Sequence, residues 1–324
     1  MSQAIRIHQT GGPSVMKLEP VEVTAPGPGQ VRVRHEAIGV NYIDTYHRSG
    51  LYPVSLPSGI GLEAAGHVDA VGDGVTQFAL GDRVAYGNGP IGAYAEYNTV
   101  ASGRLANIPD AVSMEEAAAI MLKGMTARYL LKETFPVKAG DTVLYHAAAG
   151  GVGLLMCQWA RDLGVTLIGT ASTAEKCQLA LSMGAAHMIN SSQEDVVARV
   201  RELTGGEGVP VVYDGVGRDT FAISLDCLRP RGLLASFGNA SGAVTGVELG
   251  ILTQKGSVYV TRPSLAHYVA SDDALATNTA DVFDAVARGA LSIRINQRYA
   301  LADAVQAHED LEARKTTGAS ILAP

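Results

Sequence analysis

The stretch Val143-Leu-Tyr-His-Ala-Ala-Ala-Gly-Gly-Val-Gly153 decides the fold. It begins as a short apolar strand and ends in a glycine pattern, after which a helical pattern continues to residue 163. A strand, a glycine-rich turn and a helix in this order form the first unit of a dinucleotide-binding fold, in which the turn and the helix N-terminus face a pyrophosphate. An ordinary tight turn without a ligand is the alternative. We expect the cofactor-binding turn to consist of Ala148, Gly150, Gly151, Val152 and Gly153, with an alanine in place of the first glycine of the pattern.

Strands and helices alternate after this turn. The predicted strands are 142–145, 166–169, 187–189, 209–213, 233–237 and 257–260, and the helices are 152–163, 174–183, 194–203 and 220–227. This alternation predicts an α/β fold with a doubly wound parallel sheet. Ligands bind at the carboxyl ends of such strands. We therefore expect the segment that ends the fifth strand to contact the cofactor, through Phe237, Gly238 and Asn239.

The end of the second strand predicts which dinucleotide binds. NAD sites usually place an acidic residue there, bonded to the ribose 2′-hydroxyl. This chain has no acidic residue between Asp162 and Glu175. Ser172 and Thr173 can donate hydrogen bonds to a 2′-phosphate, and Lys176 can supply charge. The predicted cofactor is NADPH, and the alternative for Lys176 is a solvated surface lysine.

The chain before residue 123 has a different pattern. Short runs rich in Val and Ile, cut by Gly and Pro, predict strands at 5–8, 30–37, 65–71, 83–86 and 93–100, typical of a barrel-like β domain. Helices are expected at 41–49 and at 110–122, the second capped by Ser113. After residue 263 we expect helices at 273–288 and 301–312 and a closing strand at 320–322.

Composition limits the classes of function. Among 324 residues, 47% are hydrophobic and the formal net charge is −7, so electrostatics disfavour a broad nucleic-acid interface. The three cysteines, Cys157, Cys177 and Cys227, show no disulfide pattern and favour a reducing compartment, the cytoplasm. No uninterrupted apolar stretch is long enough to predict a membrane span.

Several segments together resemble the zinc-free medium-chain dehydrogenase/reductase family, and within it the NADPH:quinone oxidoreductase (ζ-crystallin-like) group. These segments are 39–46, 50–53, 61–66, 81–84, 123–127, 146–153, 213–217, 236–239 and 261–263. The resemblance implies a GroES-like β-barrel catalytic domain made of residues 1–122 and 263–324, and a Rossmann NADPH-binding domain made of residues 123–262. It also implies reduction of a small-molecule quinone by NADPH, and a homodimer paired through the edge strand near 257–260.

The resemblance implies catalytic residues as well. Asn41, Tyr46 and Tyr52 would line the substrate pocket and hydrogen-bond to quinone oxygens as negative charge develops. Lys123 and Thr126 would start a helix beside the nicotinamide. Packing is the alternative for the tyrosines, and a surface charge at a helix end is the alternative for Lys123. Further contacts to the cofactor would come from Ser191, Val216 and Arg314, although some relatives carry a tyrosine at the place of Ser191.

No metal is expected. Zinc-dependent relatives use a cysteine and a histidine where this chain has Asn41 and Leu62, and a leucine cannot bind zinc. His67 is expected to be an ordinary strand histidine. Two other functions stay open: reduction of enals or enones on the same scaffold, and a non-enzymatic role as a structural or single-stranded RNA-binding protein. Against the RNA role stand the net charge and the single tryptophan, Trp159, which lies within a predicted helix.

Overall fold

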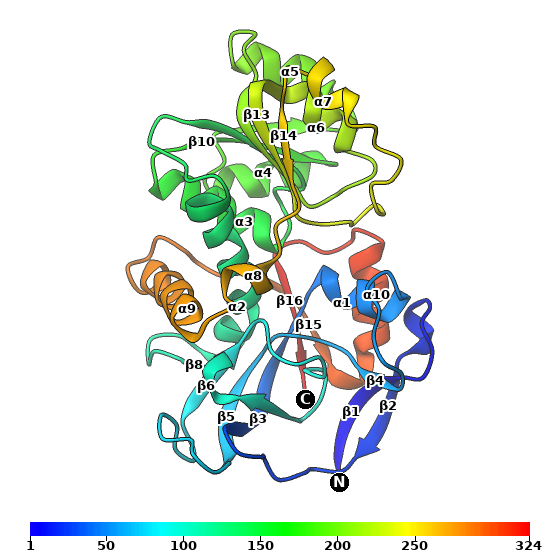
Figure 1. Ribbon diagram of the computed structural model, residues 1–324, viewed down its shortest axis with the longest axis vertical. Coiled ribbons are helices and arrows are strands. Elements are labelled where there is room, and N and C mark those ends of the chain that lie inside the picture. The colour runs from blue at the N-terminus through cyan, green and yellow to red at the C-terminus, as the bar shows by residue number, and fades with distance from the viewer. The chain divides into compact units, whose positions relative to one another are not determined.

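The computed structural model describes every residue from Met1 to Pro324 and divides into two compact units (Figure 1). Unit 1 consists of residues 1–125, 269–289 and 293–324, and unit 2 consists of residues 126–268 and 290–292. Both ends of the chain therefore belong to unit 1, while unit 2 is built almost entirely from one continuous stretch.

Unit 2 contains a sheet of six parallel strands in the order β11-β10-β9-β12-β13-β14. The strands are β9 (Thr142–Tyr145), β10 (Thr166–Ala171), β11 (His187–Asn190), β12 (Val209–Asp214), β13 (Leu228–Ser236) and β14 (Tyr259–Thr261). The helices are α3 (Gly151–Asp162), α4 (Ala174–Ser182), α5 (Val196–Leu203), α6 (Phe221–Cys227), α7 (Gly250–Gln254) and α8 (Leu265–Tyr268). This order confirms the predicted doubly wound parallel sheet. The strand order reverses between β9 and β12, and such sheets bind ligands at the carboxyl ends of the strands at this point.

Burial explains why these strands could be recognised. Leu144, Ile168, Val212 and Leu234 are completely buried in one apolar cluster. Parallel strands covered by helices read as nearly continuous apolar runs for this reason. The predicted start of the last strand at Ser257 is wrong, because Ser257 has a φ of +55°, in the left-handed region, and the strand begins only at Tyr259.

Unit 1 contains two sheets (Figure 1). The larger has the order β15-β16-β3-β5-β6-β8, with β7 also paired to β3, and the smaller has the order β2-β1-β4. The strands are β1 (Ser2–Ile7), β2 (Lys17–Val21), β3 (Gln30–Val40), β4 (Ser58–Gly59), β5 (Ala64–Val71), β6 (Arg83–Tyr86), β7 (Tyr97–Ala101), β8 (Ala106–Asn107), β15 (Ile295–Ala300) and β16 (Ala319–Ala323). The helices are α1 (Tyr42–Ser49), α2 (Met114–Tyr129), α9 (Asp272–Ala287) and α10 (Ala304–Glu312).

The strand predicted at 93–100 is too long. Only Tyr97–Ala101 is a strand, since the preceding residues bond to separate partners: Tyr94 N–H donates to the Ile60 carbonyl and Ala95 forms an isolated bridge with Ala4.

Helix α2 also differs from its prediction. The Ser113 cap is confirmed, because Ser113 Oγ accepts from Glu116 N–H (3.2 Å) and the Glu116 carboxylate accepts from Ser113 N–H (2.9 Å). The helix does not end at residue 122, however, and no new helix starts at Lys123. It continues to Tyr129 and then as a π-helical turn, η3 (Leu130–Thr134). Gly124 fits within it because Val282 of α9 fills the space where a side chain would lie.

Candidate active site

The glycine turn at the start of α3 has the geometry that a pyrophosphate requires. Gly150 is the N-cap, with extended backbone (φ −79°, ψ 173°), so the first N–H groups of α3 follow it directly. A Cβ on Gly150 would meet only the Ala147 carbonyl, at 3.3 Å, whereas a Cβ on Gly153 would lie 2.6 Å from the Ala148 carbonyl oxygen. Gly153 therefore serves the packing of helix against strand, and Gly150 leaves space beside the turn for a ligand.

The alanine in the first position of the pattern is accommodated by a glycine on the next strand. Ala148 is completely buried, and a Cβ on Gly169 of β10 would lie 2.7 Å from the Cβ of Ala148. The missing side chain at Gly169 thus makes room for the methyl group of Ala148. The departure from a three-glycine pattern leaves the turn intact.

His146, which sequence reasoning did not select, lies at the carboxyl end of β9. Its Nδ1 lies 3.1 Å from Thr170 Oγ1, while its Nε2 is buried and has no hydrogen-bond partner. Burial lowers the pKa of the imidazole, so the ring is neutral at pH 7. An unsatisfied buried nitrogen beside the glycine turn fits a site that receives a polar ligand.

Among the residues predicted near a 2′-phosphate, which follow β10 and β11, two hydroxyls bond to neighbouring groups of the chain. The Thr173 hydroxyl caps α4, accepting from Lys176 N–H (3.3 Å). It also bonds to the carboxylate of the exposed Glu175, whose pKa is lowered by the backbone N–H of Glu175 and by this hydroxyl. Ser191 Oγ donates to the Ala171 carbonyl (3.2 Å). The Thr173 and Ser191 hydroxyls are thus engaged in these bonds, and the contacts of Ser172, Thr173, Lys176 and Ser191 to a 2′-phosphate stay predictions.

Two further residues, which were not among the predicted site residues, hold the loops at this edge of the sheet. Asp214, at the end of β12, is buried and accepts from Val216 N–H (2.8 Å), Gly217 N–H (3.0 Å) and the hydroxyls of Thr220 and Ser224. It fixes the loop that contains Val216, whose contact to the cofactor stays a prediction.

The second of these residues is Arg262, which follows β14. Its Nη1 donates to the carbonyls of Ser236 and Gly238, both at 2.8 Å. The segment from Phe237 to Asn239 is thereby held at the carboxyl end of β13. The only sequence signal for Arg262 was the motif 261–263.

In unit 1, a buried carboxylate organises the predicted catalytic residues. Glu63 is completely buried and accepts from Asn41 Nδ2 (2.7 Å), Lys123 Nζ (3.0 Å) and the backbone N–H of Leu122 (2.7 Å). Lys123 is only 6% exposed, so the alternative of a surface charge is wrong. The ion pair brings Asn41 and Lys123 to one carboxylate, although 82 residues separate them in the sequence.

Asn41 and the two predicted tyrosines lie on or beside α1. Asn41 is the N-cap of this helix and is buried. The rings of Tyr46 and Tyr52 meet edge to face with centroids 5.2 Å apart, and Tyr52 N–H donates to the Tyr46 carbonyl (3.0 Å). Tyr46 is 7% exposed and Tyr52 is half-buried, so packing accounts for much of their surface, and a role toward substrate stays a prediction.

Two further predicted site residues lie on or after other helices. Thr126 is buried on α2, where unit 2 begins, and Arg314 is exposed after α10 in unit 1, with a φ of +58°. Their contacts to a cofactor stay predictions.

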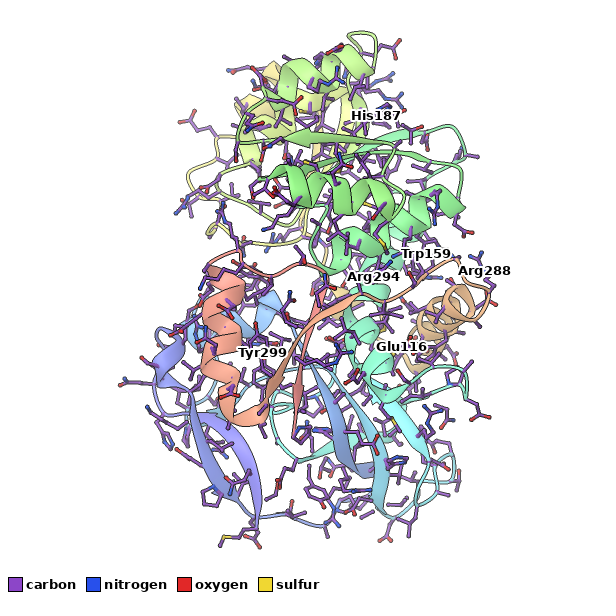
Figure 2. The ribbon with its side chains drawn as sticks, turned by 180° about the vertical axis from the view of Figure 1, so that it is seen from behind. Glu116, Trp159, His187, Arg288, Arg294 and Tyr299 are labelled. Atoms are coloured by element: carbon purple, nitrogen blue, oxygen red, sulfur yellow. The ribbon has the colours of Figure 1, made fainter.

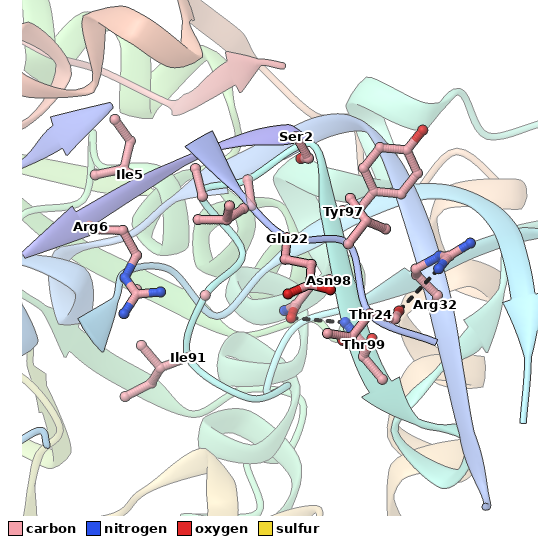
Figure 3. A pocket seen from close by; sticks show the side chains of 16 residues that line it. Ser2, Ile5, Arg6, Glu22, Thr24, Arg32, Ile91, Tyr97, Asn98 and Thr99 are labelled. Atoms are coloured by element: carbon pink, nitrogen blue, oxygen red, sulfur yellow. Dashed lines mark hydrogen bonds between the residues drawn. The ribbon is translucent and has the colours of Figure 1, made fainter. Parts of the chain in front are cut away.

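A groove of about 280 Å³ lies elsewhere in unit 1, lined by parts of β1, β2 and β7 and including Arg6, Glu22 and Asn98 (Figure 3). None of the predicted site residues lines it.

No group of three or more His, Cys, Asp or Glu side chains is arranged to hold a metal ion. No helix has the length and apolarity needed to cross a membrane. Trp159 lies on α3 (Figure 2). It is 1% exposed, with the Lys132 ammonium over its ring, so the ring has no face open to a nucleic-acid base.

Comparisons with known proteins cover the chain from end to end. A zinc-binding dehydrogenase family model matches residues 151–268, and an alcohol dehydrogenase GroES-like domain model matches residues 27–110. The quinone oxidoreductase of Pseudomonas aeruginosa is 55% identical over 325 residues, covering 100% of both chains. The crystal structure of Escherichia coli quinone oxidoreductase complexed with NADPH matches with a TM-score of 0.98 at 51% identity, covering 99% of this chain and 100% of that one. A 2-haloacrylate reductase from a Burkholderia species is 45% identical over 334 residues, covering 100% of this chain and 99% of its own.

Proposed function

The chain belongs to the quinone oxidoreductase group of the medium-chain dehydrogenase/reductase family, and from this premise we propose that it reduces quinones with NADPH. The predicted family and fold class, a GroES-like domain with a Rossmann domain, are confirmed. The observation that carries the proposal is the open glycine turn at Gly150, next to a β10 end that lacks an acidic ribose partner.

The residues of unit 2 fit a dinucleotide. The turn from Ala148 to Gly153 would hold the pyrophosphate, Ser172 and Lys176 the 2′-phosphate, and the loops fixed by Asp214 and Arg262 the nicotinamide half. When bound, NADPH supplies a hydride. The protein supplies binding, orientation and electrostatics, and the chain's residues in these loops determine how the coenzyme is held.

Unit 1 would supply the acceptor site. Because the Glu63 carboxylate can only accept, the Asn41 amide must turn its NH₂ group toward it, and one N–H remains to donate elsewhere. Lys123 likewise has donors beyond its bond to Glu63. Both groups can stabilise negative charge that develops on a quinone oxygen, and burial strengthens that interaction. The ring faces of Tyr46 and Tyr52 suit a flat aromatic acceptor.

The test is the oxidation of NADPH at 340 nm on addition of 1,4-benzoquinone, compared with NADH at the same concentration. We expect turnover with NADPH and much weaker turnover with NADH. No turnover with several simple quinones would contradict the proposal.

Reduction of an activated carbon–carbon double bond is a second candidate. It is favoured by the match to a protein named 2-haloacrylate reductase. A panel of 2-haloacrylates, enals and enones distinguishes the two, since turnover of these compounds but not of quinones would favour the second candidate.

We also propose a homodimer formed through β14 and a cytoplasmic location. In support of the dimer, β14 is an edge strand that exposes 62% of Tyr259 and 40% of Val260. Sedimentation of the purified protein at about twice 33.7 kDa, and of Tyr259→Asp at the monomer mass, is the expected result. The location rests on the three cysteines, which are all unpaired.

A further inference from the structure

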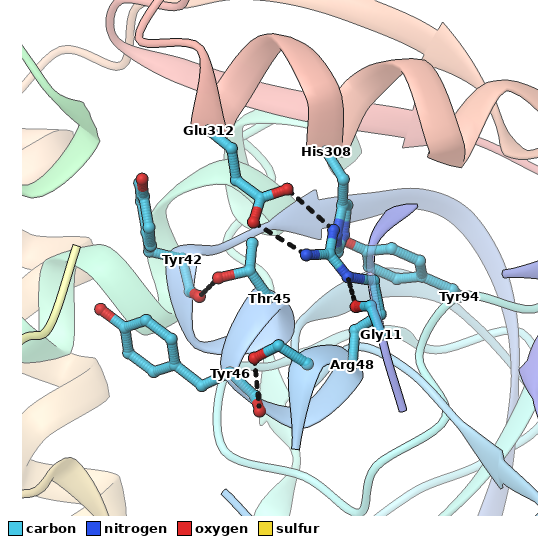
Figure 4. Close-up of polar contacts among 9 residues, drawn as sticks. Gly11, Tyr42, Thr45, Tyr46, Arg48, Tyr94, His308 and Glu312 are labelled. Atoms are coloured by element: carbon cyan, nitrogen blue, oxygen red, sulfur yellow. Dashed lines mark hydrogen bonds and ion pairs between the residues drawn. The ribbon is translucent and has the colours of Figure 1, made fainter. Parts of the chain in front are cut away.

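A row of buried polar side chains connects α10 with the start of α1. Figure 4 shows the part of this row next to α10, where Arg48 pairs with Glu312 beside His308. Arg48 of α1 is 2% exposed and binds both carboxylate oxygens of Glu312, at 2.8 and 2.9 Å. Its Nη1 also lies 3.1 Å from His308 Nδ1. His308 Nε2 lies 3.0 Å from the Tyr94 hydroxyl, which lies 3.0 Å from Asp44 Oδ2. Arg48, His308, Tyr94 and Asp44 are called the Asp44 chain below.

The direction of every hydrogen bond in the Asp44 chain follows from chemistry. A guanidinium can only donate, so His308 Nδ1 must accept from Arg48. Burial and Arg48 together lower the pKa of His308 to about 3, so the ring is neutral and carries its proton on Nε2. That N–H donates to the Tyr94 oxygen, and the Tyr94 O–H therefore donates to Asp44. All three hydrogen bonds thus point from Arg48 toward Asp44, and aligned hydrogen bonds polarise one another.

Asp44 connects this row of side chains to Asn41 by a hydrogen bond. Its Oδ2 accepts from the backbone N–H of Asn41 at 2.8 Å, which fixes the first residue of α1, while its Oδ1 is buried without a partner. Burial raises the pKa of Asp44 to about 7, opposed by the Asn41 and Tyr94 bonds and by the charge of Lys123, and reinforced by the charge of Glu63. With no solvent to hold it, the carboxyl group takes its orientation from the Asn41 N–H and the Tyr94 hydroxyl.

We propose that the Asp44 chain positions Asn41 for acceptor binding, so that Tyr94 and His308 are positioning residues that act through Asp44. This inference rests on the proposed function, in which the Asn41 amide donates to the acceptor oxygen. The Asp44 chain explains why α10 carries both the buried His308 and Glu312, the partner of the buried Arg48. Both residues help to orient Asn41.

The decisive variant is Tyr94→Phe, which keeps the ring and removes the hydroxyl. Its matched control is Tyr86→Phe. Tyr86 is also completely buried, and its hydroxyl also lies 3.0 Å from a buried histidine, Nε2 of His35, but it is not part of the Asp44 chain. Both variants should lose similar thermal stability. Only Tyr94→Phe should raise the KM for 1,4-benzoquinone, by about three- to tenfold, with kcat changed less than about twofold and the Kd for NADPH unchanged.

A second measurement does not depend on turnover. In protein labelled with ¹³C at the aspartate carboxyl groups, the NMR titration of Asp44 should move to higher pH in Tyr94→Phe, because a donor to the ionised form is lost, and stay in place in Tyr86→Phe. Equal effects of the two variants on KM, or an unchanged Asp44 titration in Tyr94→Phe, would overturn the proposal.

Asn41→Ala separates this proposal from the proposed function. If Asn41 binds the acceptor, its loss raises the benzoquinone KM, and Tyr94→Phe adds nothing further in that background. A raised KM in Asn41→Ala with no effect of Tyr94→Phe refutes only the positioning role. An unchanged KM in Asn41→Ala refutes the acceptor role of Asn41, and the positioning proposal with it.

Discussion

The two glycines of the turn should respond in opposite ways to the same added methyl group. In Gly153→Ala, the new Cβ would lie 2.6 to 2.7 Å from backbone atoms of Ala147 and Ala148, which cannot move without shifting β9 or α3. Such overpacking costs about 1–3 kcal/mol. At about 2–4 °C per kcal/mol for a unit of this size, the midpoint of thermal unfolding should fall by several degrees.

In Gly150→Ala, the new Cβ meets only one backbone oxygen, at 3.3 Å, and the φ of −79° is open to any residue. The reduced freedom of the unfolded chain favours the variant by about 0.4–1 kcal/mol, while alanine is a poorer N-cap than glycine by a similar amount. The stability without cofactor should therefore change by less than about 1 kcal/mol. The methyl group fills the space beside the pyrophosphate turn, so NADPH affinity should fall at least about tenfold, or 1.4 kcal/mol.

Circular dichroism of the cofactor-free variants and calorimetric titration with NADPH measure the two effects separately. Gly250→Ala is the matched control, because Gly250 also begins a helix of unit 2 and nothing lies within 4 Å of its added Cβ. Wild-type NADPH affinity in Gly150→Ala, or a loss of stability equal to that of Gly153→Ala, would refute this account of the turn.

Three further substitutions test the charges. Lys176→Ala should weaken NADPH by about 1–3 kcal/mol and leave NADH unaffected in calorimetry, and an equal loss for both would remove Lys176 from the 2′-phosphate. Glu63→Gln leaves Lys123 buried without its counter-charge, so urea unfolding should show a loss of about 3–5 kcal/mol, and an unchanged midpoint would contradict the buried ion pair. Asp44 titrates at 3.8 in the unfolded chain and at about 7 in the folded one. Between these pH values the folded state holds a proton that the unfolded state has lost. The contribution of this carboxyl group to the free energy of unfolding is therefore fully present below pH 4. About 4 kcal/mol of it is lost as the pH rises through 7. The stability of Asp44→Asn relative to wild type should therefore rise across that window, and parallel pH curves would be the contrary result.

Local patterns were enough to predict the parallel sheet, the glycine turn and the Ser113 cap, because each depends on residues that lie close together in the sequence. The extent of α2 could not be predicted in this way. Gly124 looks like a break in the local pattern, and the packing of Val282, more than 150 residues away, makes it compatible with a helix.

The candidate site was predicted only in part for the same reason. Asn41 and Lys123 were selected by resemblance, but the carboxylate that joins them, Glu63, becomes evident only in three dimensions. Asp214 and Arg262 support loops whose contacts to the cofactor were predicted from the resemblance, for Val216, and from a strand end, for Phe237 to Asn239. Arg262 bonds to carbonyl groups 24 and 26 residues earlier in the chain, and Asp214 bonds partly to backbone N–H groups. Backbone groups are present in every residue, so neither partnership leaves a signal in the residue types.

The close fit between Ala148 and Gly169 limits the order in which this turn can change. A methyl group at position 169 has no room until the one at position 148 is removed, while the Met188 thioether, the other near neighbour, is flexible enough to give way. The unstrained route by which descendants of this sequence exchange the two residues passes through an intermediate with glycine at both positions, and a library that varies position 169 alone should return mostly glycine there.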